Sequence, residues 1–295
     1  MKPKIGRSIR PELKGLLFVS PWLVGLLWFY LYPFVASLYY SFHNATAFGP
    51  GAFIGLRNYE LLIRDPLFWK SLANTIYFTA GSLSIGTVLA LSLALLLPKN
   101  VRGATAYRTI FYLPTVVPFT AVSVIWIWIL HPQYGPLNHL LEQLGLEAPG
   151  WLSDPTWAMP GLILVSAWSI GNMMVIYLAA MLEIPTELYE AAKLDGASPW
   201  QRLIRITIPL LTPVILFNLI VGLIGGFQYF VQPYVMTNGG PADSTLVYSL
   251  YLYRNAFQFF RMGYASAMGW VLFLLILAGT VLVLRSTRRW VHYRG

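Results

Sequence analysis

The sequence predicts an all-α integral membrane protein with six transmembrane helices, and two observations lead to this fold class. Of the 295 residues, 57% are hydrophobic and only 11% are charged, with a mean hydropathy of +0.61. Soluble proteins average about 45–50% apolar and about 25% charged residues. The charged residues also leave uninterrupted apolar stretches, and a helix needs about 20 such residues to cross the roughly 30 Å hydrocarbon core of a bilayer.

Six stretches contain no Asp, Glu, Lys or Arg, namely Gly15–Phe42, Ser71–Pro98, Thr109–Leu141, Pro155–Leu182, Ile206–Ala242 and Met262–Leu284. The transmembrane spans expected within them are 15–41, 72–97, 109–130, 157–181, 209–235 and 263–284. The fifth stretch ends in Pro, Gly and Asn residues, which indicates one helix and a loop. The first is far longer than the 7–15 apolar residues of a signal peptide, so we interpret it as a retained membrane anchor.

The distribution of Lys and Arg predicts the orientation. Fifteen of the 20 lie in the N-terminal tail, the second and fourth loops and the C-terminal tail. Cytoplasmic loops carry this excess in membrane proteins, so both termini are predicted to be cytoplasmic. The predicted organisation is a basic tail over 1–14, a single transmembrane domain over 15–284 and a second basic tail over 285–295.

Several function classes are disfavoured by what the sequence lacks. It has no cysteine, so disulfides and thiol chemistry are excluded. It has no GxxxxGK[ST] phosphate-binding loop, no zinc-ligand spacing and no acid–base constellation of an enzyme. The basic residues lie in short strips between apolar stretches, which does not suit nucleic-acid binding. We therefore expect no catalytic residue, no metal ligand and no cofactor in this chain.

The most informative segment is the predicted cytoplasmic loop 184–209. Pro185 with the acidic Glu187 is typical of a helix start, and Gly196 is typical of a left-handed helix end. Ser198 then suits an N-cap, with Pro199 and Gln201 in the positions of a capping box. The pattern predicts two short helices joined at a turn. On helix signals alone it is also compatible with an ordinary amphipathic connector.

The exact string identifies a family. Glu190-Ala191-Ala192, three residues, Gly196, nine residues and Ile206-Thr207-Ile208-Pro209 resemble the EAA loop of ABC importer permeases, with Ile208 where that family has Leu. Two other stretches resemble the maltose-transporter class of these permeases, so that the resemblance covers about residue 14 to the end. They are Gly55-Leu56-Arg57-Asn58-Tyr59 with Phe68-Trp69 and Asn74-Thr75, and Thr237-Asn238-Gly239-Gly240-Pro241 with Thr245.

This resemblance implies a type I ABC importer permease fold in the inner membrane of a prokaryote. It implies half of a translocation path for a sugar or oligosaccharide, working by alternating access and not as an enzyme. The implied partners are a second permease, two ATPase subunits that hold ATP and Mg²⁺, an extracytoplasmic solute-binding protein and membrane lipid. The implied ATPase-docking residues are Glu190, Ala191, Ala192, Asp195 and Gly196.

Two sets of residues are candidates for the substrate path, because each shares one helix face by its spacing. They are Trp168, Ser169 and Asn172 in the fourth span, and Gly222, Gly226 and Tyr229 in the fifth. Together they offer hydroxyl, amide and aromatic groups, and by resemblance they fall near the sugar site of the maltose class. The alternative is helix packing, which small and polar residues commonly serve in membranes. Asn218, Gln228 and Gln232 are further polar residues of the fifth span.

The loop Thr237, Asn238, Gly239, Gly240 and Pro241 is expected on the outer side. Gly-Gly-Pro is by itself a turn signal, and the resemblance adds contact with the binding protein or gating of the outer mouth. Two alternatives remain open for the function. One is a permease of the same class for glycerol phosphate or another small polar solute. The other is a self-contained secondary transporter, which the absence of ionisable groups in the spans disfavours.

Overall fold

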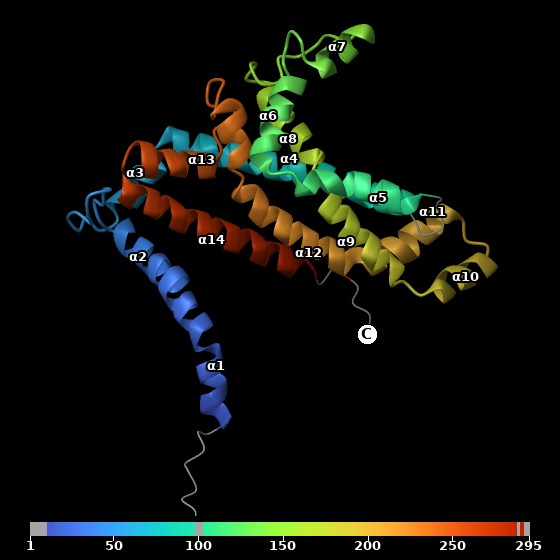
Figure 1. Ribbon diagram of the computed structural model, residues 1–295, viewed down its shortest axis with the longest axis horizontal. Coiled ribbons are helices and arrows are strands. Elements are labelled where there is room, and N and C mark those ends of the chain that lie inside the picture. The colour runs from blue at the N-terminus through green and yellow to red at the C-terminus, as the bar shows by residue number, and fades with distance from the viewer. Residues whose placement is uncertain (1–10, 98–102, 288–289, 292–295) are drawn as a thin grey trace, which may run out of the picture. The chain divides into compact units, whose positions relative to one another are not determined.

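The computed structural model describes residues 11–97, 103–287 and 290–291, with side chains from residue 15 onward. Within these residues all regular elements are helical, apart from isolated bridges between His43 and Phe53 and between Thr46 and Gly49. The all-α prediction is therefore confirmed. Figure 1 shows the elements in chain order.

Four helical segments of the described chain are long and apolar enough to cross a membrane. The first, Gly15–Ser41, consists of α1 (Pro11–Leu26), the π turn η1 (Leu27–Leu31) and α2 (Tyr32–Ser41). The second is α4 (Pro66–Leu96). The third, Pro199–Phe227, consists of α11 (Pro199–Arg202), the π turn η3 (Leu203–Thr207) and α12 (Ile208–Phe227). The fourth is α14 (Met262–Ser286).

Two bent helix pairs are also long and apolar enough when taken together, and the described chain has up to six candidate spans if each pair is one span. The first pair joins α5 (Ala104–Tyr112) and η2 (Leu113–Val116) to α6 (Phe119–Ile129) with a bend of 101°. The second joins α8 (Ala158–Ala167) to α9 (Gly171–Leu182) with a bend of 44°. The shorter elements are α3 (Arg57–Arg64), α7 (Pro136–Gln143), α10 (Thr186–Leu194), η4 (Pro233–Thr237), α13 (Tyr248–Tyr253) and η5 (Arg254–Gln258).

These breaks differ from the uninterrupted spans that the sequence analysis expected, and the first has a local cause. Val117 adopts an extended backbone with φ −74° and ψ 129°, because the residue before a proline is disfavoured in the helical region; Pro118 follows it. The fifth span, expected to reach residue 235, ends its helix at Phe227. After it the chain enters an irregular turn and the separate element η4, which begins at Pro233.

The chain forms two compact units. The first comprises 1–64 and 255–271. In it, the Asn58 amide donates hydrogen bonds to the carbonyls of Ser41 and His43, at 2.8 and 2.9 Å. The Tyr59 hydroxyl donates to Ser41 Oγ at 2.9 Å. The Gly55–Tyr59 stretch therefore holds the end of α2. Large apolar side chains of α1 and α2 are mostly exposed, a surface that suits lipid.

The second unit comprises 65–254 and 272–295, and α4 lies at its centre. It packs against α8, α9, α12 and α13 (Figure 1). Glycines allow the close approach of α12: a Cβ on Gly222 would lie 2.4 Å from Leu83 Cδ1, and one on Gly226 would lie 2.5 Å from Thr79 Oγ1. Small residues at such crossings are a common means of packing membrane helices. The cytoplasmic placement of both termini stays a prediction.

Candidate functional site

The second unit contains a partly open cavity of about 660 Å³, a volume within the roughly 300–1,000 Å³ of small-molecule sites. Its walls come from α4, α6, α8, α9, α12 and the segment that follows α12. Among the described residues that line it there is no Asp, Glu, Lys, Arg or His. The polar ones are amides and hydroxyls: Ser82, Ser166, Ser169, Asn172, Asn218, Gln228, Tyr229 and Gln232.

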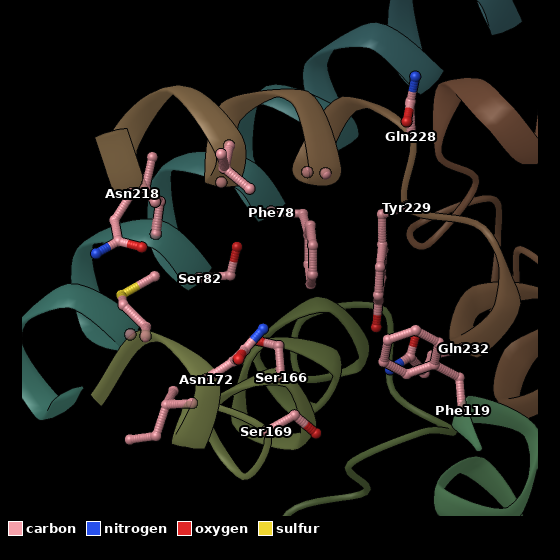
Figure 2. A pocket seen from close by; sticks show the side chains of 18 of the residues that line it. Phe78, Ser82, Phe119, Ser166, Ser169, Asn172, Asn218, Gln228, Tyr229 and Gln232 are labelled. Atoms are coloured by element: carbon pink, nitrogen blue, oxygen red, sulfur yellow. The ribbon is translucent and has the colours of Figure 1, made fainter. Parts of the chain in front are cut away.

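An aromatic pair lines this cavity. The rings of Phe78 and Tyr229 are parallel within 9°, with centroids 3.8 Å apart. Figure 2 shows the two rings face to face, with Asn218 on the side of Phe78 and Gln232 beside Tyr229. The Tyr229 hydroxyl is buried and has no hydrogen-bond partner among the described residues. The cavity therefore presents a flat apolar surface and uncharged hydrogen-bonding groups to a bound molecule.

Five of the six residues proposed for the substrate path line this cavity: Ser169, Asn172, Gly222, Gly226 and Tyr229. Trp168 is not among the lining residues, and its ring makes an edge contact with Trp126 at 6.1 Å between centroids. The helix is interrupted between Ala167 and Gly171. The spacing argument for one shared face does not hold across that break.

Both glycines of the substrate-path set also pack against α4, as described above, so the packing alternative applies to them as well. The glycine that faces open space is Gly225, which lines the cavity and where an added Cβ would meet nothing within 4 Å. Sequence reasoning missed this residue. It also missed Phe78 and Ser82 on α4. The sequence of α4 does not indicate which part of its surface stays uncovered when α12 packs against it.

The loop 184–209, called the elbow from here on, contains the two short helices that the sequence predicted, α10 and α11. Gly196 has φ +76°. The Ala197 amide donates to the Ala192 carbonyl at 2.9 Å and the Gly196 amide to the Lys193 carbonyl at 3.1 Å, the bonds of a Schellman helix end. Ser198 and Gln201 form the predicted capping box. The predicted helix signals are confirmed.

The elbow presents both charged and apolar groups on its surface. Glu190, Ala191, Asp195 and Gly196 are exposed, and Ala192 is half-buried. Three large apolar side chains lie exposed beside them, on Leu188, Leu194 and Trp200, with Leu194 89% accessible. These three lie outside the charge-free stretches of the sequence, so lipid is a poor cover for them. The surface has the mixed character of a protein interface.

The segment 237–247, which is predicted to lie on the outer side and is called the outer segment from here on, is fixed to the start of α4. The Asn74 amide donates to the carbonyls of Asp243 and Leu246, at 2.9 and 3.0 Å. Lys70 Nζ donates to the carbonyl of Ala242 at 2.7 Å, and Thr75 Oγ1 accepts from the Tyr248 amide at 2.8 Å. The Asn74-Thr75 stretch and the segment after Thr237, which are far apart in the sequence, are thus neighbours in space.

Within this segment the loop Thr237–Pro241 turns sharply. Asn238 and Gly239 both have positive φ, 44° and 79°, and the Gly240–Pro241 peptide bond is cis. Thr245 Oγ1 donates to the Gly240 carbonyl at 2.7 Å, and the Arg254 side chain donates to the Asn238 carbonyl. Burial raises the pKa of Tyr248, which follows the segment, above its ordinary value.

Comparison with known sequences adds to this geometry. The family model described as "Binding-protein-dependent transport system inner membrane component" matches residues 86–292. This protein belongs to that family. The elbow and most of the residues that line the cavity lie inside the matched range. Phe78 and Ser82 precede this range, and so do Lys70 and Asn74, which donate hydrogen bonds to the outer segment.

Relatives match nearly the whole permease. It is 40% identical to the "Probable ABC transporter permease protein YesP" of Bacillus subtilis over 99% of this chain and 96% of that protein. It is 38% identical to the "Lactose transport system permease protein LacF" of Rhizobium radiobacter over 90% and 91%. A solved chain of a bacterial ABC transporter involved in the import of the acidic polysaccharide alginate is 27% identical, with a TM-score of 0.83 over 94% and 96%. The importer permease fold is confirmed.

Proposed function

We propose that this permease forms half of the translocation path for a neutral sugar or oligosaccharide, in an ATP-driven importer that depends on a binding protein. The cavity in the second unit is the place where the sugar passes. The elbow residues Glu190, Ala191, Ala192, Asp195 and Gly196 contact an ATPase subunit, which holds the ATP and Mg²⁺. A second permease completes the path, and the loop Thr237–Pro241 faces the solute-binding protein.

The observation that carries the proposal is the chemistry of the cavity wall. Sugars expose hydroxyl groups around a ring with apolar faces. The cavity wall offers groups that suit both features, namely four amides, three serines and the Phe78–Tyr229 ring pair. A sugar phosphate or uronate would bring a negative charge into a low-dielectric site, where an unpaired charge is costly. This chain contributes no cation to the wall, so its half of the site favours a neutral solute over the acidic cargo of the alginate importer.

The test uses the whole complex, purified with its ATPase and second permease and reconstituted in proteoliposomes with the binding protein. Neutral oligosaccharides should drive uptake and stimulate ATP hydrolysis. A hydrogen bond contributes about 0.5–1.5 kcal/mol net, so Asn172→Ala and Tyr229→Ala should each lower uptake by up to about tenfold. Phe18→Ala, at an 88% exposed side chain of α1, is the control and should transport normally.

Each alternative predicts another result. Uptake and stimulation by sugar phosphates or uronates alone would favour the glycerol-phosphate type of permease. Uptake that continues without ATP or the ATPase subunits would indicate a secondary transporter. Normal uptake in both Asn172→Ala and Tyr229→Ala would remove the cavity of this chain from the sugar path.

A further inference from the structure

One hydrogen bond connects the first helix of the elbow to the beginning of the cavity-lining helix. Tyr189 Oη and Thr207 Oγ1 lie 2.8 Å apart. Tyr189 lies on α10, and Thr207 is the last residue of the π turn η3, immediately before α12. Thr207 is only 5% exposed, so water competes weakly for its hydroxyl and the bond is retained.

This bond has no substitute elsewhere on α10. None of the α10 residues is buried. Within the described part of the chain, Tyr189 also makes the only side-chain hydrogen bond from α10 to another element. The backbone route from α10 to α12 passes through the turn at Gly196, which has a positive φ. The Tyr189–Thr207 bond is a second connection from α10 to the end of η3, and it bypasses that turn.

The segment that receives the bond is well placed to pass a displacement on. The capping box at Ser198 and Gln201 holds α11 as a defined helical turn, and η3 continues from it into α12 without a break. π turns occur often at functional sites. Along α12 the same helix brings Asn218 and Gly225 to the cavity wall. A pull on Thr207 therefore acts on the helix that shapes the solute site.

We propose that Tyr189 is a positioning residue for energy coupling. Its hydroxyl, through Thr207, makes a movement of α10 turn α12, so that closure of the ATPase changes the cavity. This inference rests on the proposed function, because it takes the docking of the ATPase on α10 from there. Without the bond the ATPase still docks, but less of its motion reaches the cavity.

The test measures solute transported per ATP hydrolysed in the reconstituted complex. Tyr189→Phe and Thr207→Val each remove one hydroxyl with little change in size. Loss of one hydrogen bond should lower this ratio by about two- to tenfold in each variant. Because both variants break the same bond, the double variant should fall no further. Thr207→Ser keeps the hydroxyl and should restore the ratio.

The control is Tyr107→Phe on α5, a half-exposed tyrosine, which should leave the ratio unchanged. Co-purification of the ATPase shows that each variant still assembles. If Thr207→Val fails to assemble, the comparison of Tyr189→Phe with Thr207→Ser decides. A normal ratio in Tyr189→Phe, or losses that add in the double variant, would overturn the inference.

A separate variant distinguishes a failure of the coupling role of Tyr189 from a failure of the proposed ATPase docking on α10. Ala191→Trp places bulk on the exposed face of α10. If this variant keeps a bound and stimulated ATPase, docking on α10 fails, and with it the part of the proposed function that assigns ATPase contact to the elbow. If the ATPase detaches in Ala191→Trp while Tyr189→Phe transports normally, only the coupling role of Tyr189 is wrong.

Discussion

The elbow and the cavity differ in how they are built. The elbow is one continuous segment, 184–209, whose helices, turn and cap form between residues a few positions apart. The cavity draws its walls from residues as far apart as Phe78 and Gln232. The elbow exposes charges and apolar side chains, whereas the cavity wall is uncharged. The proposed docking surface is thus encoded locally here, and the proposed solute surface only by tertiary packing.

The strongest test of this difference is at the elbow. Ala191→Trp should abolish co-purification of the ATPase and its stimulation by the loaded binding protein, because an indole cannot fit where a methyl group allows close contact. The spans should still insert, since Ala191 lies outside the charge-free stretches. Glu190→Lys should weaken docking by reversing the charge, and Gly196→Val should do so by straining the turn, since a β-branched residue poorly tolerates positive φ.

The control for these variants is Glu142→Lys, a charge reversal on α7 in the predicted outer loop. It should leave ATPase binding unchanged. If the elbow variants retain both the partner and its stimulated rate, the elbow is only a connector. The elbow could then no longer be regarded as a docking surface and compared as such with the cavity.

The cavity offers the next largest effect, at Gly225. Because an added Cβ there meets nothing within 4 Å, Gly225→Phe should fill the cavity without displacing α4. Transport should fall by more than about tenfold, the scale of one lost polar contact, while the complex still assembles. The readouts are uptake in proteoliposomes and co-purification of the partner subunits.

The matched control is Gly25→Phe on α1, where an added Cβ also meets nothing within 4 Å but which is not among the residues that line the cavity. It should transport normally. Equal losses in both variants would show that bulk in a membrane helix is harmful by itself. Normal transport in Gly225→Phe would exclude this cavity from the path.

The sequence predicted the elbow well because its signals act over short distances. Gly196 and Ser198 each set local backbone geometry through capping bonds, and these bonds form as expected, while Pro185 immediately precedes the first residue of α10. The long apolar helices were predicted for a similar reason, since length and composition suffice. Helix breaks were harder. Pro118 marks one break, but the interruption after Ala167 has no proline, and Trp168 was placed on a face that the break removes.

The cavity could be predicted only in part. Asn172 and Tyr229 were recognised because a polar or amphipathic side chain in an apolar span is conspicuous. Phe78 was not recognised, because the sequence around an aromatic residue in an apolar helix does not indicate which residues it will contact in the fold. Gly222 and Gly225 are alike in sequence, yet one packs against Leu83 and the other faces open space. That distinction depends on the crossing of α4 and α12, which a single sequence does not specify.

The smallest effect is expected where local and tertiary bonds act together, in the outer segment 237–247. Asn74→Ala removes two hydrogen bonds to the carbonyls of that segment, while Lys70, Thr75 and the turn's own bonds remain. A loss of about 1–2 kcal/mol of local stability should speed hydrogen exchange of the amides in 242–247 by roughly tenfold. The elbow amides should exchange as before, and so should the outer segment in the exposed control Gln143→Ala. Unchanged exchange in Asn74→Ala would mean that this segment, like the elbow, is held by its own turn and owes little to α4.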